Sequence, residues 1–276
     1  MASGKKLVWW KWILLFIAGF LFGGFTNLLA VIGDDLCQYA LHIPILTIVT
    51  SGIVLALYAL YVRLTEKRWP TDLKCTQMVS HTLLGLLVGT VYLTLVVSII
   101  VALGYASVSW TDFSAKSQFS AIMTFLAVAV GEEIMCRGIL FRLIDERRNT
   151  WIAMLVSALI FGLGHISNDN ATWWSSFAIA IEAGLLLAAA YKWSGSLWLP
   201  IGIHWAWNYV QGNVFGLSVS GMNAGDAILA TTVSGPDIIT GGDFGPEASI
   251  IAVTLGIIYT IVFLQHNHLP PTKRKN

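Results

Sequence analysis

The stretch SQFSAIMTFLAVAVGEEIMCRGILFRLI, residues 117–144, decides the fold of this chain. It is longer than the roughly 20 residues that a bilayer-spanning helix needs and is mostly apolar. Arg142 lies near its end, but Glu132, Glu133 and Arg137 lie well inside it. A charged side chain at the centre of a bilayer costs at least about 2.5–3.5 kcal/mol on insertion scales. We therefore expect these three residues to be paired, to face a polar cavity or to have a function.

The composition of the whole chain is that of a membrane protein. Of its 276 residues, 56% are hydrophobic and only 11% are charged, whereas about 25% of the residues in soluble domains are charged. The net charge of +1 gives no basic excess for a nucleic acid, and three cysteines are too few for a disulfide framework. Soluble enzymes and nucleic-acid-binding proteins are therefore excluded, and membrane lipids are the expected surroundings.

Uncharged runs define most of the expected helices. Six runs are long enough to span a bilayer: residues 12–33, 37–62, 75–111, 149–168, 193–225 and 248–272. Two more segments, residues 117–144 and 172–191, are long enough but carry internal charges. We expect an all-α polytopic membrane protein with eight transmembrane helices and an active site inside the bundle. The first run is too long for the apolar region of a cleaved signal peptide, so we expect it to be retained.

The basic residues agree with eight spans. If the N-terminus lies inside, the inner segments hold 14 basic residues and the outer segments hold only Lys116, as the positive-inside rule predicts. The 14 are Lys5, Lys6, Lys11, Arg63, Lys67, Arg68, Lys74, Arg142, Arg147, Arg148, Lys192, Lys273, Arg274 and Lys275. The outer segments are acidic, and Glu247 is interpreted as one of their surface residues. We expect a multi-pass protein of the plasma membrane with both termini in the cytoplasm.

One integrated membrane domain is expected, in two parts. Residues 1–116 would form three N-terminal helices, and residues 117–276 a catalytic core of five helices. The loop of residues 218–247 is rich in Gly, Ser and Asp and contains two prolines. Such a composition predicts a loop, here an outer cap over the last two helices.

Three polar residues are expected at one depth in the membrane. Glu132, His165 and His204 lie in three different apolar segments. Counting from the nearest inner-surface residue at about 1.5 Å per helical residue places them roughly 20, 24 and 18 Å deep. A carboxylate and two imidazoles at a common depth favour a shared site over three unrelated burials.

Helical spacing separates the two adjacent glutamates. Glu133 and Arg137 are four residues apart with the acid first, which is the favourable order for an ion pair within a helix. We expect this pair to be structural. Glu132 points about 100° away around the helix and has no opposite charge one turn from it, so it is free to act elsewhere.

Three ordered motifs resemble a known family. They are Glu132-Glu133-x-x-x-Arg137, Phe161-x-x-x-His165 and His204-x-x-x-Asn208, each in its own apolar segment. Together they resemble the CAAX-processing and bacteriocin-processing intramembrane proteases. The loop Gly-Gly-Asp-Phe-Gly-Pro-Glu of residues 241–247 is similar to bacterial members.

The resemblance has consequences for function. It implies an intramembrane endopeptidase of the glutamate or metallo type, acting on a membrane-associated or prenylated CAAX-type protein or peptide. Its bacterial members imply peptide processing or immunity. Cys136 stands where the family commonly has an aromatic residue, and Glu182 matches no motif position.

A glutamate and two histidines support peptide hydrolysis in two ways. His165, His204 and Glu132 would hold Zn²⁺ with an open fourth position. Without a metal, Glu132 and His165 would activate water directly, while His204 and Asn208 would bind the oxyanion. The commonest zinc signature, His-Glu-x-x-His, is absent from the sequence. We expect the metal-free mechanism, with the zinc site as the alternative.

Other interpretations of these residues remain open. A small proton-coupled transporter would also place glutamates and histidines inside a membrane, and a non-catalytic scaffold would keep the fold without the chemistry. Considered one at a time, His165 and His204 are also explained as histidines that only pack between helices. Asn208 alone is also explained as a residue that hydrogen-bonds between helices. Cys136 is expected to be a packing residue, and the role of Glu182 is left open.

Overall fold

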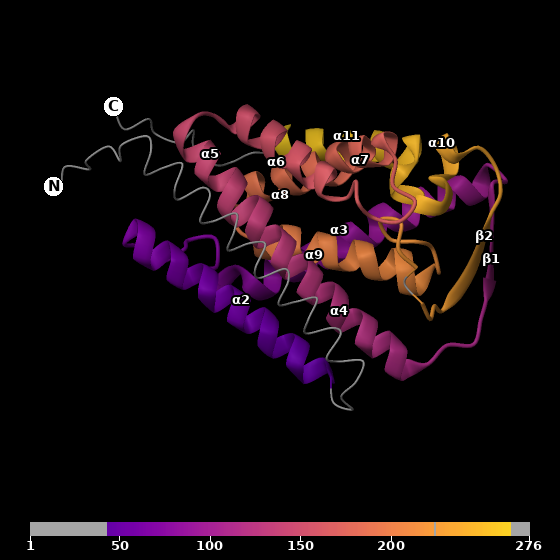
Figure 1. The fold of residues 1–276 in the computed structure, drawn as a ribbon, viewed down its shortest axis with the longest axis horizontal. Coiled ribbons are helices and arrows are strands. Elements are labelled where there is room, and N and C mark those ends of the chain that lie inside the picture. The colour runs from indigo at the N-terminus through magenta and orange to yellow at the C-terminus, as the bar shows by residue number, and fades with distance from the viewer. Residues whose placement is uncertain (1–42, 224, 266–276) are drawn as a thin grey trace.

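The computed structural model describes residues 43–223 and 225–265. The first expected span, residues 12–33, lies outside these ranges, so the count of eight spans stays a prediction. Apart from one two-stranded ribbon, the described chain is all-α (Figure 1). Its α-helices are α2 (Ile43–Glu66), α3 (Cys75–Ala102), α4 (Ala115–Glu133), α5 (Arg142–Arg147), α6 (Thr150–Gly164), α7 (Trp173–Ile179), α8 (Leu186–Ser194), α9 (Trp198–Tyr209), α10 (Asp237–Thr240) and α11 (Ile250–Gln265).

Four helical stretches of the described chain are long and apolar enough to cross a membrane. They are Thr47–Glu66, Cys75–Ala102, Ala115–Arg147 and Trp173–Ser194. The helices α6 and α11 are apolar but shorter. These lengths and compositions indicate a multi-pass membrane protein.

Three π-helical segments interrupt or extend the α-helices. η1 (Ile134–Phe141) joins α4 to α5, η2 (Ala180–Leu185) joins α7 to α8, and η3 (Val210–Val214) follows α9. A π-helical segment adds a residue to the turn and shifts the helix faces that follow it, and such segments are frequent at functional sites.

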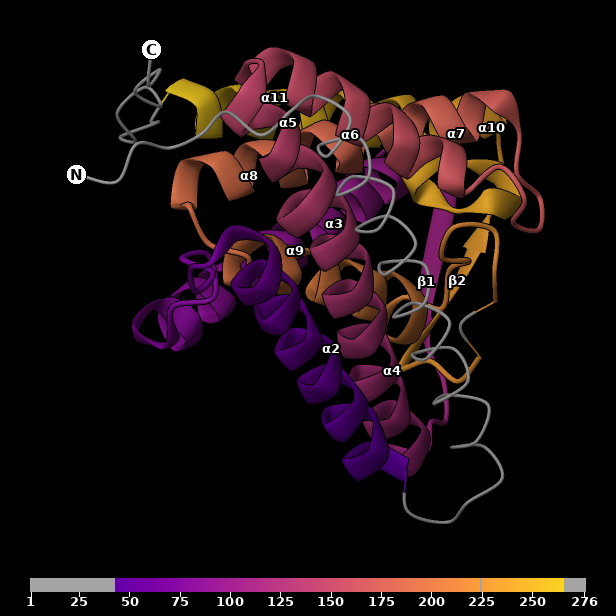
Figure 2. The same cartoon turned by 60° about the vertical axis from the view of Figure 1, so that its left-hand side comes forward.

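The uncharged run of residues 75–111 is longer than the helix that it contains. α3 stops at Ala102, and Gly104 takes a positive φ of 80° that ends the helical path. β1 (Ala106–Trp110) then pairs with β2 (Leu229–Val233) in an antiparallel ribbon, visible in Figure 2. The loop 218–247 is therefore tied to the end of α3, because β2 belongs to that loop.

α3 packs directly along α9. A Cβ atom on Gly85 would lie 2.4 Å from the carbonyl oxygen of Leu199, and one on Gly89 would lie 2.3 Å from that of Ile203. The two glycines are four residues apart, the spacing that lets membrane helices approach closely. Since His204 follows Ile203, this contact sets the position of a predicted site residue.

Polar contacts hold the predicted inner end of the bundle. Arg142 lies 2.7 Å from Glu66, which connects the end of α2 to α5. The buried carboxylate of Asp72 accepts hydrogen bonds from Tyr58 at 2.8 Å and from Tyr191 at 2.9 Å. These contacts anchor the connection between α2 and α3 to α8.

Candidate functional site

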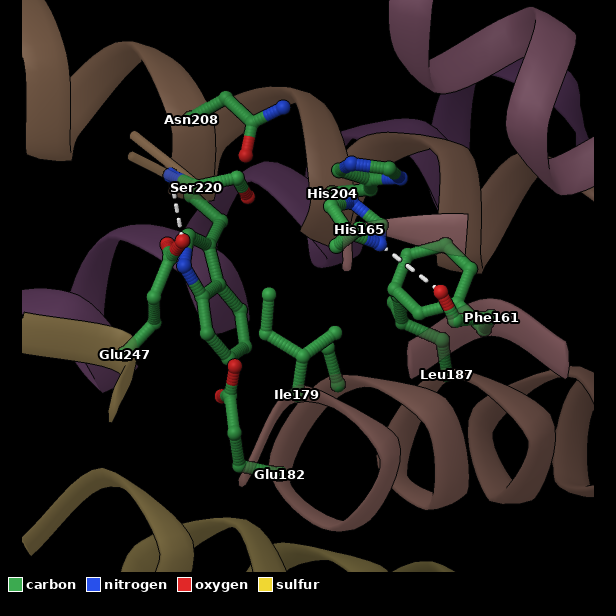
Figure 3. Close-up of a pocket in the computed structure, with 11 residues that line it drawn as sticks. Phe161, His165, Ile179, Glu182, Leu187, His204, Asn208, Ser220 and Glu247 are labelled. Carbon is green, nitrogen blue, oxygen red and sulfur yellow. Dashed lines mark hydrogen bonds between the residues drawn. The ribbon is translucent and has the colours of Figure 1, made fainter. Parts of the chain in front are cut away.

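A small buried pocket lies between α6, α9, η2 and the two ends of the outer loop (Figure 3). Its volume is about 20 Å³, which is enough for one water molecule. It is lined by Phe161, His165, Ile179, Glu182, Ala183, Leu187, His204, Trp207, Asn208, Ser220 and Glu247. We call the part around His165 and His204 the histidine end, and the part around Glu182 and Glu247 the acid end.

His204 lies beside both adjacent glutamates. Its Nδ1 is 3.0 Å from Oε1 of Glu133, and its Nε2 is 3.9 Å from Oε2 of Glu132. A carboxylate only accepts hydrogen bonds, so His204 donates through Nδ1 to Glu133. The sequence interpretation paired Glu133 with Arg137 alone and missed this second partner.

The pair of Glu133 and Arg137 links helices and also contacts the site. Arg137 Nη1 lies 2.7 Å from Glu133 Oε1, and both side chains are fully buried. Arg137 Nη2 donates to the carbonyl oxygens of Ala183 at 3.3 Å and Gly184 at 3.1 Å. Its guanidinium also lies 4.7 Å from the ring centroid of Phe161. The ion pair thus joins η1 to η2 and supports His204 through Glu133.

His165 is placed by the end of α6. It is the C-cap residue of that helix, and its Nδ1 lies 2.8 Å from the carbonyl oxygen of Phe161. Because a carbonyl only accepts, Nδ1 carries a proton, and in the neutral imidazole Nε2 is then the nitrogen with the free lone pair. The Phe161 ring contacts both imidazoles, with centroid distances of 5.0 Å to His165 and 5.9 Å to His204.

The remaining predicted residues lie close by. Asn208 is one turn after His204, has 8% of its surface exposed and lines the pocket. The side chain of Glu132 is 21% exposed and reaches His204 from outside the pocket lining. Its buried Oε2 has no hydrogen-bond partner within the described residues. His165, His204 and Asn208 therefore meet at the pocket, with Glu132 beside them.

Comparison with known families identifies this part of the chain. Residues 114–210 match the family model described as type II CAAX prenyl endopeptidase Rce1-like. The chain contains an Rce1-like CAAX endopeptidase domain. The resemblance inferred from the three motifs is thereby confirmed over residues 114–210, and similarity to this family implies a hydrolase of the endopeptidase class. No curated protein and no solved structure matches the chain.

The Rce1-like domain does not contain the whole pocket. It runs from the start of α4 to η3 and includes all three motifs. Ser220 and Glu247 lie beyond it, as does Tyr92 of α3 on the other side. The acid end is thus completed by segments outside the matched domain.

Glu247 is the residue that the sequence interpretation placed wrongly. It was expected at the outer surface, but only 2% of it is exposed and it lines the pocket. Its carboxylate accepts hydrogen bonds from Gln211 Nε2 at 2.7 Å and from the backbone N–H of Ser220. Burial raises the pKa of Glu247, while these donors and His165 act against that rise. The sequence signal for its burial was its position after Gly-Pro and directly before an apolar helix.

Glu182, which the sequence left open, forms the other half of the acid end. It belongs to η2 and is 1% exposed. The hydroxyl of Tyr92 lies 3.1 Å from Glu182 Oε2 and 2.6 Å from the carbonyl oxygen of Ala252. Gly256 allows α11 to approach closely, since a Cβ there would lie 2.6 Å from the Cα of Glu182.

The three π-helical segments adjoin the site. Glu132 and Glu133 directly precede η1, which contains Arg137. η2 contains Glu182, and η3 contains Gln211, the hydrogen-bond donor to Glu247. Helices with a uniform α-helical turn would rotate these side chains away from their present partners.

The residues present do not form a zinc ligand set. Within residues 43–223 and 225–265, no group of three His, Cys, Asp or Glu side chains is arranged to hold a metal ion. The geometry therefore does not fit the alternative of a zinc ion held by His165, His204 and Glu132.

Proposed function

We propose that this protein is an intramembrane endopeptidase that hydrolyses a peptide bond of a membrane-associated or prenylated CAAX-type protein or peptide. The observation that carries the proposal is the meeting of His165 and His204 at one buried pocket, with Glu132 and Glu133 against His204. These residues lie within the Rce1-like domain. Packing alone does not require two imidazoles and two carboxylates at one point of an apolar bundle.

In this mechanism Glu132 and His165 activate the attacking water. His165 presents the unprotonated Nε2 as an acceptor because its Nδ1 is bound to Phe161. Glu132 supplies a carboxylate whose Oε2 has no partner among the described residues. Water held by these two acceptors attacks the carbonyl carbon as Glu132 takes one of its protons.

His204 and Asn208 stabilise the oxyanion. With Nδ1 donating to Glu133, His204 donates through Nε2 only when both nitrogens carry protons. The net charge of the site is then zero, because the two carboxylates of Glu132 and Glu133 offset the Arg137 guanidinium and the His204 imidazolium. The imidazolium therefore has a compensating charge beside the oxyanion site. The Asn208 amide supplies a second donor to the oxyanion. As the C–N bond breaks, the leaving nitrogen takes the proton held by Glu132.

The test uses the peptides that accumulate in membranes. Cells producing Glu132→Gln should retain peptides or proteins that wild-type cells process. Purified wild-type protein should cleave those molecules, and Glu132→Gln, His165→Asn and His204→Asn should not. Glu146→Gln, at a 43% exposed side chain near the end of α5, is the matched control. Cleavage by all three site variants would contradict the proposal.

The transporter alternative has its own readout. Proton-coupled transport would appear as peptide-free proton flux into proteoliposomes that depends on Glu132 or Glu182. Such flux without peptide hydrolysis would replace the endopeptidase proposal. Loss of both activities in intact wild-type protein would favour the scaffold.

Metal content is tested directly. Elemental analysis of purified protein should show no stoichiometric zinc, and chelators should leave hydrolysis intact. About one zinc ion per chain that is lost in His165→Asn or His204→Asn would contradict water activation by Glu132 and His165 alone.

We extend the proposal to topology, with eight spans in the plasma membrane and both termini in the cytoplasm. The support is the distribution of the basic residues. Cysteines introduced at Ser234 and Lys273 should react with a membrane-impermeant reagent from opposite sides. Labelling of both from the same side would contradict the eight-span arrangement.

A further inference from the structure

The basic neighbour of Glu247 among the described residues is the imidazole of His165, which the proposed mechanism keeps neutral. No Lys or Arg is among the described residues that line the pocket. The nearby guanidinium of Arg137 is already bound to Glu133 and to two backbone carbonyls. Burying a carboxylate without a positive partner costs free energy. The net charge of Glu182 and Glu247 therefore decides which kind of ligand the acid end binds.

Hydrogen-bond donors assign one proton to the two carboxyl groups. The Tyr92 hydroxyl has a single proton, and the shorter contact, 2.6 Å, is to the Ala252 carbonyl, which only accepts. A neutral Glu182 that donates to the hydroxyl oxygen would accommodate both contacts, at 3.1 Å to Glu182 and 2.6 Å to Ala252. Glu247 accepts from Gln211 and from the Ser220 N–H, as a carboxylate does.

The rest of the pocket suits a small donor. Asn208 is more than nine-tenths buried, faces the pocket and has no hydrogen-bond partner within the described part of the chain (Figure 3). The rings of Phe161 and Trp207 also line it, and aromatic faces attract cations. A volume of about 20 Å³ admits a group the size of one water molecule.

We infer that the acid end is a binding site for a primary ammonium group, held by the Glu247 carboxylate with the Asn208 amide oxygen and the aromatic rings around it. A primary ammonium is close to water in size, carries three donors and supplies the missing charge of +1. It would come from a substrate lysine, from a free α-amino terminus or from the amine released by cleavage. The inference deepens the proposed function, since the occupant belongs to a peptide.

The first experiment uses methylammonium chloride as the probe and needs no substrate. The melting temperature of the full chain in detergent is measured against sodium chloride and tetramethylammonium chloride at equal ionic strength. Methylammonium should raise it by about 2–4 °C with a saturating dependence on concentration. Tetramethylammonium, which is larger and has no N–H donors, should not. Equal melting temperatures in all three salts would overturn the inference.

Two variants of the same pocket form a matched pair. Glu247→Gln removes the carboxylate and should abolish the methylammonium effect. Glu182→Gln replaces one neutral group by another, so the effect should persist. A methylammonium effect that persists in Glu247→Gln would overturn the inference, and the reverse pattern would overturn the proton assignment on which it rests. If Glu247→Gln does not fold, the wild-type salt series together with Glu182→Gln decides.

Peptide variants distinguish the source of the ammonium group. Cleaved peptides are compared with free and acetylated N-termini, and with lysine replaced by norleucine. A substrate ammonium should lower KM about tenfold in wild-type protein and not in Glu247→Gln. If no such preference exists but methylammonium inhibits hydrolysis, the released amine is the occupant.

The two proposals fail separately. Peptide hydrolysis without any response to methylammonium or to substrate amines would remove the ammonium site and leave the endopeptidase. Methylammonium binding by a protein that cleaves no peptide would keep the site and remove the proposed function.

Discussion

The two ends of the pocket handle charge in opposite ways. At the histidine end, Arg137 and His204 both meet Oε1 of Glu133, at 2.7 and 3.0 Å. At the acid end, the hydrogen-bond partners of Glu182 and Glu247 among the described residues are neutral groups, from Tyr92, Gln211 and the Ser220 backbone. The charges of the histidine end balance one another, as the proposed hydrolysis requires. The acid end has more hydrogen-bond acceptors than donors, which suits the proposed ammonium group of a ligand.

The two ends also differ in how the sequence encodes them. The histidine end comes from three motifs with partners four residues apart, a spacing that a helix converts into contact. The acid end is assembled from η2, α3 and the far end of the outer loop. Changes at the histidine end should therefore be the more severe, and the following tests measure the difference.

The largest effect is expected where the buried ion pair is broken. Glu133→Gln leaves the Arg137 guanidinium unpaired, at a cost of about 3–5 kcal/mol in the free energy of unfolding. It also removes the acceptor of His204, so hydrolysis should fall more than the lost stability explains. The double variant Glu133→Gln, Arg137→Met should be more stable than Glu133→Gln alone, because no buried charge is left over. Additive losses in thermal unfolding would contradict this.

Glu132→Gln should affect activity and leave stability nearly unchanged. The residue is partly exposed and makes no ion pair as short as that of Glu133. Loss of a general base typically lowers the rate by about 10²–10⁴-fold, while the melting temperature should stay close to that of wild type. Activity and melting temperature are measured on one preparation. An active Glu132→Gln beside a stable, inactive Glu133→Gln would reverse the two assignments.

The contact between α3 and α9 supports both ends, through Tyr92 and His204. Gly89→Ala would place a Cβ 2.3 Å from the Ile203 carbonyl oxygen, so the helices must separate. Overpacking of this kind costs about 1–3 kcal/mol, and both hydrolysis and methylammonium binding should weaken. Gly52→Ala in α2, where a Cβ meets nothing within 4 Å, is the control. Equal behaviour of the two variants would show that the contact does not position the site.

The smallest effect is expected from a single hydroxyl at the acid end. Tyr92→Phe removes the contacts to Glu182 and Ala252, and a net loss of about 0.5–1.5 kcal/mol is typical of one hydrogen bond. Tyr259→Phe is the control, because its ring packs against Tyr92 while its hydroxyl has no hydrogen bond within the described residues. Chemical denaturation of both variants measures the difference. A loss as large as that of Glu133→Gln would contradict the ranking of the two ends.

The local sequence pattern predicted where helices occur but not where they end. Apolar runs predict the helical stretches because hydropathy and length are read along one segment. They did not predict that α3 ends at Ala102, because the following residues form β1 only by pairing with β2 from a distant loop. For the same reason the loop 218–247 was expected as a cap without strands.

By itself, the sequence determined that this is an α-helical membrane protein and that Glu133 lies next to Arg137, which follow from hydropathy and from one helical turn. It also predicted that three motifs share a site, from their matched depths and from the family that they resemble. Only the tertiary structure decided that Glu133 also holds His204 and that Glu247 enters the pocket opposite Glu182. Those contacts join residues far apart in the chain, and their existence depends on how glycine-mediated helix packing and three π-helical segments orient whole elements, which no local spacing encodes.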